Sequence, residues 1–546
     1  MNSNKLLKIE KLKYYLLILF VVIQPLLDIY YLYTDKVVNM IGFSPSTIIR
    51  VIITALLVLL TLVTLRNKKR WIFIISYIVI VGIYTILHVL NANSFYSLVP
   101  GNFGYSLAGE LFYIVRLMIP LSILFITYNM NISSDDFEKA IITILLLIAG
   151  TIVITNIFKV SLNSYTNETI KANIFGWFMG AYDKYNYSSL ASKGIFNFAN
   201  QIAALLVLLL PAMLAIYTKK STVTNLFIII ITIIAMIMLG TKVALFGAII
   251  EVFVFIAILI FMRIFKKEKT INKKNMLMIG LSILVIGGLF MKSPAINREI
   301  VARQVRINNS KIEVKGVEDQ SKEKIKTEPQ KKDPLDNIDI IENENIDKLE
   351  NKGMEQVTQP SKGDKDAMIE YIEKNYKNLM VNEQFITQSY PYQYDPEFWV
   401  EIINLPVVDR LDWRNLEQRM LQRVMDINDN PMDKYLGITF VRTQNIFNLE
   451  RDFLSQYYSI GILGVLVFLG PYIILPLICF IKMLMNFKEK FNIVSTSLCF
   501  AVLFALGVSY YSGNVIDALT VTIIMAFILG HLINLVFKEN INRKVH

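Results

Sequence analysis

The stretch Phe227–Phe261 reads FIIIITIIAMIMLGTKVALFGAIIEVFVFIAILIF, two apolar runs separated only by Gly240, Thr241 and Lys242. Runs of this kind cross a bilayer as helices, because a helix satisfies its backbone N–H and C=O groups within the segment. The short connection predicts that the two helices form a tight hairpin. This stretch therefore predicts an all-α membrane protein.

The composition extends this prediction to the whole chain. Of its 546 residues, 54% are hydrophobic and only 18% are charged. The mean hydropathy of +0.48 lies outside the range of soluble globular proteins. We expect a polytopic helical bundle with about twelve spans. These spans are expected near residues 14–33, 46–65, 71–90, 108–128, 138–158, 196–217, 223–240, 243–265, 276–291, 453–481, 493–511 and 515–537.

Basic residues mark one side of this bundle. They gather in the even-numbered connections and the C-terminal tail, at 66–70, 219–220, 263–274, 482–490 and 538–544. Only the connection 129–139 lacks this excess of basic residues. Because cytoplasmic connections carry an excess of Lys and Arg, both termini are expected in the cytoplasm. The basic N-terminus precedes a long apolar run without a small-residue cleavage site, so we expect a retained span and not a signal peptide.

One long polar block interrupts the apolar pattern at residues 292–452. The topology places this block outside the cytoplasmic membrane. Its part 311–365 is rich in Lys, Glu, Asp, Asn and Gln and has almost no aromatic residues, a composition typical of disorder. Its part 366–452 has helical apolar spacing and is expected to form a helical lid. The block separates nine spans in 1–291 from three spans in 453–546.

Several classes of function are disfavoured by the composition. The net charge of +11 lies in clusters beside the spans and does not accompany a nucleic-acid-binding motif, so no nucleic-acid partner is expected. Cys479 and Cys499 fall within spans and are expected to be packing residues. His88, His531 and His546 are too scattered for a metal cluster. We expect neither a metal nor a cofactor.

Charged residues inside the predicted spans are the first candidates for a site. Arg116 falls within the fourth span, with Glu110 near the outer end of that span and Asp28 near the outer end of the first. Intramembrane ionisable groups often mark a substrate site. The alternative is that Arg116 snorkels to the surface or pairs structurally with one of these two acids.

Basic residues on the outer side form a second set of candidates. Lys242 lies at the turn of the predicted hairpin, where a lipid-linked phosphate would be in reach. Arg410, Arg414 and Arg419 decorate a helix predicted from Arg410 to about Met425. Its residues expected to face inward are Leu411, Leu416, Met420, Leu421 and Val424. Arginine binds phosphate oxygens in a bidentate way. The alternative is an ordinary interfacial lysine and a solvated helix face.

Glu450 and Asp452 stand where the polar block returns to the membrane. On a helix, residues two apart diverge by about 200°, so the two carboxyl groups are not expected to act as one dyad. One of them could serve as a base while the other caps a helix. The alternative is that both acids simply begin a helix, because negative charge is favourable at a helix N-terminus.

Taken together, three stretches resemble the O-antigen ligase and polysaccharide polymerase family of bacterial membrane glycosyltransferases. Phe196–Leu205 resembles the family's Asn-Pro-Asn segment, and Gly240–Leu245 resembles its Ser-Arg turn. Glu450–Gly464 resembles the His-Asn-x-Tyr-Leu…Gly-x-x-Gly stretch that closes the family's large outer loop. Two positions depart from the family. Glu450 stands at the histidine position, and Lys242 replaces the arginine.

The resemblance implies a metal-independent transfer reaction. The donor would be a glycan linked to undecaprenyl pyrophosphate at the outer face of the cytoplasmic membrane, and the acceptor a glycan or lipid-linked glycan. Lys242 and one or more of Arg410, Arg414, Arg419 and Arg116 would hold the pyrophosphate. Glu450, or less favourably Asp452, would accept the proton of the acceptor hydroxyl.

Two other classes of protein fit part of the sequence. A transporter or flippase for lipid-linked sugars would have a similar number of spans, but we expect repeat-related halves and broken helices in it and find neither pattern in the sequence. A non-catalytic scaffold would use the outer block as a binding domain. Within the family, an abundance of Lys, Asn and Ile suggests a Gram-positive source, which favours a polymerase over a ligase.

Overall fold

The structure is a computed structural model and describes residues 3–34, 44–99, 104–301, 303, 363–376, 381, 383–405, 409, 413–446, 451–513 and 515–538. All but the last three residues of the segment predicted to be disordered, 311–365, lie outside these residues. Glu450, Arg410 and Leu411 also lie outside them.

The described part of the chain is almost entirely helical, which confirms the all-α prediction. Ten helices in it are long and apolar enough to cross a membrane. Eight of these ten are single α-helices: α11, described below, and α3 (Pro45–Thr64), α4 (Lys68–Asn93), α5 (Leu107–Asn129), α9 (Ala199–Lys219), α12 (Lys273–Phe290), α25 (Ile493–Tyr511) and α26 (Leu519–Phe537).

The hairpin predicted by the opening stretch is present. Helix α10 (Val223–Met238) is followed after three residues by α11 (Lys242–Phe265), the eighth long helix. Gly240 makes the turn with a positive φ of 67°, which costs a glycine little. A side chain there would stand 2.7 Å from Ala191. At 16 residues α10 is shorter than the other spans, so the number twelve stays a prediction.

Two long spans contain a π-helical turn. The ninth consists of α6 (Ser134–Leu145), η3 (Leu146–Gly150) and α7 (Thr151–Ile157). The tenth consists of α22 (Asp452–Gly464), η7 (Val465–Leu469) and α23 (Gly470–Met485). Such turns widen a helix locally and are frequent near functional sites.

The first helix differs from the prediction. Helix α1 extends over Ser3–Val22, whereas the sequence predicted a span at 14–33. Pro25 lacks a backbone N–H and therefore ends the α-helical ladder. Two short 3-10 turns, η1 (Gln24–Asp28) and η2 (Tyr30–Leu32), continue the chain to the end of the bundle.

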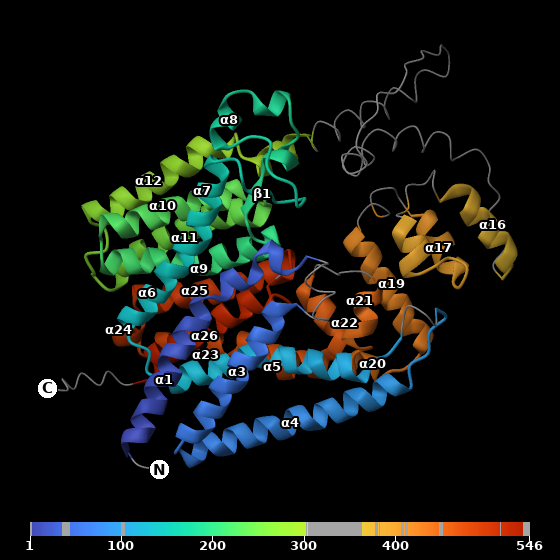
Figure 1. Cartoon of the computed structure of the whole chain (residues 1–546), viewed down its shortest axis with the longest axis horizontal. Helices are drawn as coiled ribbons and strands as arrows, with labels where there is room; N and C mark the ends of the chain where they lie inside the picture. Colours follow the sequence, from blue (N-terminus) through green and yellow to red (C-terminus); the bar gives the residue numbers. More distant parts are fainter. Residues whose placement is uncertain are drawn as a thin grey trace.

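Helices α9 and α26 form the centre of the bundle. Nearly all of their residues are buried, whereas most of α4 and α12 faces outward. Helix α26 packs closely on α5 and α23, and α9 packs on α25 and α11. Figure 1 shows these helices as adjacent diagonal layers, with α4 along one margin and α12 along another. The exposed apolar faces of α4 and α12 have the composition expected of a lipid-facing surface.

The lysine-rich connections lie at one end of the bundle, here called the basic end. Lys220 Nζ lies 2.7 Å from Asp135 Oδ1, and Lys266 Nζ donates to the Phe491 carbonyl at 2.6 Å. The connection 129–139 is net acidic, because Asp135, Asp136 and Glu138 outnumber Lys139, and two of these acids pair with Lys220. The grouping fits the alternation of connections that the sequence predicts. Which end faces the cytoplasm stays a prediction.

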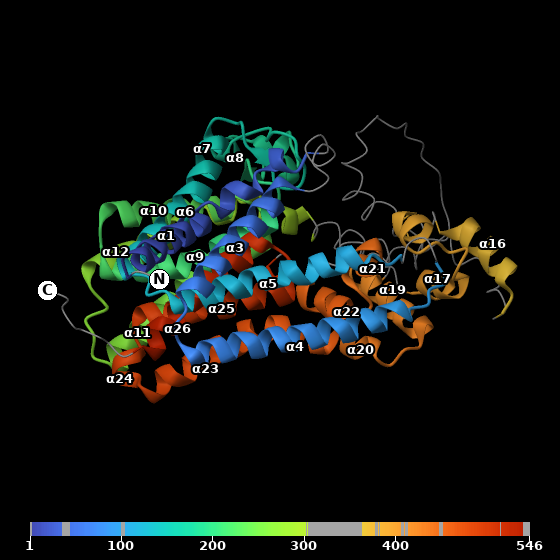
Figure 2. The ribbon, with the colours of Figure 1, turned by 60° about the horizontal axis from the view of Figure 1, so that its bottom comes forward.

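The opposite end carries the lid, defined here as the described residues of 363–446. Figure 2 shows the lid helices at one end of the bundle and α24 (Phe487–Lys490) at the other. The lid contains α16 (Lys365–Asn375), η6 (Phe385–Ser389), α17 (Pro396–Ile403), α19 (Trp413–Asn428), α20 (Asp433–Leu436) and α21 (Phe440–Ile446). The helix predicted from residue 410 corresponds to α19, and its expected inward residues Leu416, Met420, Leu421 and Val424 are buried.

Short elements between α7 and α9 lie at the lid end beside the hairpin turn. They are β1 (Leu162–Asn163), α8 (Ile174–Phe178), η4 (Ala181–Asp183), η5 (Tyr187–Leu190) and β2 (Ser192–Gly194). Strands β1 and β2 pair antiparallel. The Tyr165 hydroxyl donates to the Gly240 carbonyl at 2.8 Å, which fixes this segment to the hairpin.

The lid is joined to the bundle at a break in α22. Gly461 has φ 65° and ψ 179°, so the helix is interrupted there. The backbone of Gly437, between α20 and α21, crosses at this point: a side chain on Gly437 would stand 2.4 Å from the Ser459 carbonyl oxygen. Ile438 N donates to the Tyr458 carbonyl at 2.8 Å. The lid backbone therefore satisfies carbonyl groups of the interrupted helix.

Candidate functional site

Asp452 begins α22 at the lid end of the bundle and is 1% exposed. Its carboxylate accepts hydrogen bonds from Ser509 Oγ at 2.9 Å and from the backbone N–H groups of Val515 and Ile516, both at 2.8 Å. Because three donors converge on this carboxylate, Asp452 holds the connection between α25 and α26 against the start of α22. The expectation that Asp452 stands at a helix N-terminus is confirmed.

Asp517 follows in the same connection and is half-buried. Its Oδ1 accepts a hydrogen bond from Gln456 Nε2 at 2.6 Å. The Gln456 amide also bonds the Tyr113 hydroxyl, whose oxygen lies 2.9 Å from Gln456 Oε1. Tyr113 stacks on Phe440 of the lid with ring centroids 3.8 Å apart. Asp517 is thus held by side chains from α5 and α22.

The surroundings of Asp517 raise the pKa of its carboxyl group above the ordinary value. Burial is the main cause, and the neighbouring Asp452 carboxylate adds to it. Arg116 and the bond from Gln456 act in the opposite direction. Asp517 is therefore closer to its protonation point at neutral pH than a surface aspartate.

Arg116 reaches this network from α5. Its Nη2 donates to the main-chain carbonyl of Asp517. The alternative in which Arg116 pairs with Glu110 or Asp28 is wrong, because each of those acids has another partner. Asp28 Oδ1 lies 2.9 Å from Arg50 Nη2 in a buried ion pair.

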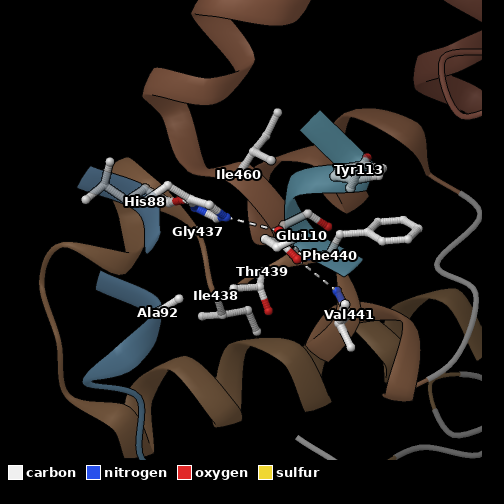
Figure 3. A network of polar contacts seen from close by, with 12 residues as sticks. His88, Ala92, Glu110, Tyr113, Gly437, Ile438, Thr439, Phe440, Val441 and Ile460 are labelled. Carbon is white, nitrogen blue, oxygen red and sulfur yellow. Dashed lines mark hydrogen bonds and ion pairs between the residues drawn. The ribbon is translucent and has the colours of Figure 1, made fainter. Parts of the chain in front are cut away.

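Glu110 belongs to a second buried network, shown in Figure 3. Its carboxylate accepts hydrogen bonds from Phe440 N at 2.8 and 3.1 Å, at the start of α21. His88 Nε2 lies 3.0 Å from Glu110 Oε1, and His88 Nδ1 lies 2.6 Å from the Leu436 carbonyl. Glu110 and His88 therefore fasten both sides of the α20–α21 junction to the bundle.

The hydrogen bonds around His88 and Glu110 come from both the bundle and the lid. A carbonyl oxygen cannot donate, so His88 Nδ1 carries a proton toward Leu436. A further proton then lies between His88 Nε2 and the Glu110 carboxyl group. Backbone N–H groups of Phe440 and Val441 also point at this carboxyl group. Glu110 therefore joins donors of the lid to His88 of the bundle.

Arg442 of α21 is a third charged group at this junction. It is buried, and its Nη1 donates to the carbonyls of Ala92 at 3.1 Å and Ile438 at 3.3 Å. Its guanidinium lies 4.1 Å from the Phe95 ring centroid. Burial lowers the pKa of Arg442, and the charge of Glu110 opposes this effect. Arg442 thus helps fix the last helix of the lid.

Lys242 lies at the first position of α11, as the hairpin prediction requires. Its Nζ is 2.5 Å from Glu299 Oε1, and both side chains are partly exposed. The adjacent Arg298 guanidinium lies 5.7 Å from the Tyr165 ring centroid and 6.0 Å from that of Tyr187. The hairpin turn therefore carries two basic groups beside an aromatic surface.

The lid arginines lie apart from the buried networks. Arg414 is half-buried and Arg419 is exposed on α19. Arg423 of the same helix is paired in a bidentate way with Asp395, at 2.7 and 3.0 Å. Its role is therefore to hold α19 against α17. The predictions for Arg410 and Glu450 fall on residues that the structure does not describe.

The structure thus brings two of the predicted site residues together, Arg116 and Asp452, through residues 515–517. Among the described residues, no hydrogen bond or ion pair joins Lys242 or Arg419 to this group. Reasoning from the sequence did not identify Asp517 or Gln456. Two signals in the sequence could have found them. Gln456 follows Asp452 by one helical turn and so shares its face of the helix. Asp517 is an isolated acid in an apolar region, which often marks a site.

Lys193 in β2 was also not identified from the sequence. It is 3% exposed, and its Nζ donates to Asn167 Oδ1 at 3.0 Å and to the Asn197 carbonyl at 2.8 Å. Burial lowers its pKa to about 8. Asn197 N in turn donates to the Asp28 carbonyl at 2.9 Å. This places the stretch that resembles the Asn-Pro-Asn segment beside the first helix.

The fold and these networks define a polytopic α-helical membrane protein with a helical lid fastened over one end. A family model described as O-antigen ligase like membrane protein matches residues 10–539, nearly the whole chain, and the chain belongs to this family. The resemblance stated from the sequence is therefore confirmed. No curated protein and no solved structure matches the chain.

Proposed function

We propose that this protein is a glycosyltransferase that polymerises or ligates undecaprenyl-pyrophosphate-linked glycan repeats at the outer face of the cytoplasmic membrane. Membership of the O-antigen ligase like family over nearly the whole chain is the observation that carries the proposal. It makes a role in polysaccharide synthesis the natural one. The lid, the hairpin cations and the buried charged networks all lie at one end of the bundle, which is the end proposed to face outward.

The donor pyrophosphate is proposed to bind at the hairpin turn and the lid arginines. Lys242 begins α11, where the helix N-terminus adds positive potential, and Arg298 is its neighbour. Arg414 and Arg419 on α19, with Arg410, supply the remaining charge. An arriving pyrophosphate would replace Glu299 as the partner of Lys242. These cations would stabilise the leaving pyrophosphate as the bond to the sugar breaks.

Glu450 is proposed to accept the proton of the acceptor hydroxyl, because it stands at the histidine position of the family. Asp452 is less suited to this step. Three hydrogen bonds from Ser509 and the backbone already engage its Oδ2, so this oxygen is committed to holding the α25–α26 connection. The oxygen of the acceptor would then attack the anomeric carbon, and undecaprenyl pyrophosphate would leave with inversion of configuration.

A flippase remains the second candidate, because one observation favours it. No broken helix was expected from the sequence, yet α22 is interrupted at Gly461. In transporters, the free backbone groups of such helices line a substrate path. Here, by contrast, Ile438 N, Thr439 N and the Tyr84 hydroxyl bond the carbonyls of Tyr458, Ser459 and Ile460. The interruption is therefore better explained by lid docking.

The test is the surface glycan of a deletion strain that carries Lys242→Ala, Arg414→Ala or Glu450→Gln. We expect each variant to shorten or abolish the polymer. Single lipid-linked repeats should accumulate if the protein is a polymerase, and complete polymers on the carrier if it is a ligase. Lys434→Ala, an exposed lysine of the lid, is the matched control. Wild-type polymer from all three variants would refute the assignment.

A further inference from the structure

Arg116 and Asp517 carry opposite charges at the same place, yet the side chains do not form an ion pair with each other among the described residues. Arg116 bonds the main-chain carbonyl of Asp517, and the Asp517 carboxylate accepts from Gln456. A guanidinium has five N–H donors and a carboxylate about four acceptor positions. Both groups are half-buried. Much of their hydrogen-bonding capacity is therefore available to a ligand.

Both charged groups are held in place by their neighbours. Gln456 is fully buried and bonds Tyr113, which is stacked on Phe440. Asp452 fixes the two residues that precede Asp517. Such support restricts the motion of Arg116 and Asp517 and lowers the entropy lost when a ligand binds. The arrangement has the form of a prepared binding site.

The charge of this group indicates the chemistry of the ligand. Arg116 contributes one positive charge, whereas Asp452 and Asp517 are two acids. A pyrophosphate would meet an acidic neighbourhood here, in contrast to the lysine and arginine at the hairpin turn. A neutral polyhydroxyl compound suits the site better, because a guanidinium donates to sugar oxygens and a carboxylate accepts from hydroxyl groups. The raised pKa of Asp517 also allows it to donate when protonated.

We propose that Arg116 and Asp517 form a subsite that binds hydroxyl groups of the acceptor sugar, with Gln456 and Tyr113 as positioning residues. The proposal rests on the glycosyltransferase function and moves Arg116 from the pyrophosphate to the acceptor. The start of α22 anchors the connection that bears Asp517. The subsite therefore lies at the start of α22, and Glu450 precedes Asp452 by two residues in the sequence.

The first experiment measures binding of a defined probe to the full-length protein in detergent. The probe is the oligosaccharide released by mild acid from lipid-linked repeats of the deletion strain, which carries no pyrophosphate. We expect Asp517→Ala and Arg116→Gln to weaken its binding by about ten- to a hundredfold, the effect of losing a hydrogen bond to a charged group. Glu401→Gln, an exposed acid of the lid, should bind like the wild type.

The second experiment uses inorganic pyrophosphate on the same variants. Arg116→Gln should bind it like the wild type, whereas Lys242→Ala should bind it more weakly. Unchanged oligosaccharide binding in both subsite variants, or no binding by the wild type, would overturn the subsite. Those results would leave the glycosyltransferase function standing, because that function is judged by the polymer of Lys242→Ala and Glu450→Gln cells. Asp517→Asn, which keeps the shape of the side chain, guards against misfolding as the cause.

Discussion

Two arginines from different helices bond residues around the start of α26, Arg50 to Thr520 and Arg116 to Asp517, and their surroundings differ. Arg50 is 3% exposed and bonds Asp28 Oδ1 and Gln24 Oε1, each at 2.9 Å. Arg116 is half-buried and, within the described part of the chain, bonds a main-chain carbonyl, although the Asp517 carboxylate is close. We call the group of Arg50 and Asp28 closed, because its two charges pair with each other. We call the group of Arg116 and Asp517 open, because the two side chains, both among the described residues, do not pair. This difference separates a structural ion pair from a candidate binding site.

The largest effect is expected when the closed pair is broken. Asp28→Ala leaves the Arg50 guanidinium buried without its carboxylate, and removing one partner of a buried pair costs about 3–5 kcal/mol. The yield of folded protein and its thermal midpoint in detergent should both fall sharply. Asp366→Ala, an exposed acid of α16, provides the control for loss of an aspartate. A stable Asp28→Ala protein would show that the closed pair is not structural.

The His88–Glu110 pair is a second closed group, and it joins the lid to the bundle. Glu110→Gln keeps the shape of the side chain but removes the charge opposite His88, and we expect a loss of about 1–3 kcal/mol. Limited proteolysis should then cut the lid faster than the bundle. The wild type and Glu373→Gln, an exposed lid acid, serve as references. Equal cleavage of the lid in all three proteins would contradict the proposed fastening.

The open group should respond in the opposite manner. Arg116→Gln removes a hydrogen bond to a single carbonyl, so we expect a change in stability of about 1 kcal/mol or less. Its surface polymer should nevertheless be shortened, because the acceptor is held less well. Chain length by gel and thermal midpoint in detergent are measured on the same variant. A large loss of stability with unchanged polymer would place Arg116 among the closed pairs.

The smallest effect is expected from pH. The pKa of Asp517 is raised in the folded protein, so this group favours the folded state at low pH, and the advantage is lost as pH rises through the raised pKa. Asp452, Arg116 and Tyr113 face it, and the Asp28–Arg50 pair bonds Thr520, three residues further along the chain. The thermal midpoint of Asp517→Asn should therefore gain on the wild type as pH rises. Parallel pH curves for the two proteins would refute the raised pKa.

Much of the fold was predictable from the sequence, because the lipid around the protein requires apolar helices. A helix that crosses lipid needs a long apolar run, and such runs are visible at Phe227–Phe261 and elsewhere. The hairpin at Gly240 and the inward face of α19 were predicted for the same reason, since turn chemistry and helical periodicity are local. The predicted bounds of the first span were wrong, because Pro25 ends the α-helical ladder and the chain continues as two 3-10 turns.

The site was less predictable, because its charges are paired through space. Glu110, Arg116 and Asp28 were recognised as unusual, but their partners His88, Asp517 and Arg50 come from other helices. Spacing along the chain could not indicate those partners. Glu450 and Arg410, which the sequence favoured, stay predictions.

The sequence by itself determined that this chain is an all-α membrane protein of the O-antigen ligase like family with one large polar block. Hydropathy and motif order are properties of the chain and need no contacts. Only the tertiary structure decided which buried charges neutralise each other. A charge in a low-dielectric interior is stable only beside a partner, and the partner is supplied by whichever helix packs against it. That packing closed the group around Asp28 and left the group around Asp517 open.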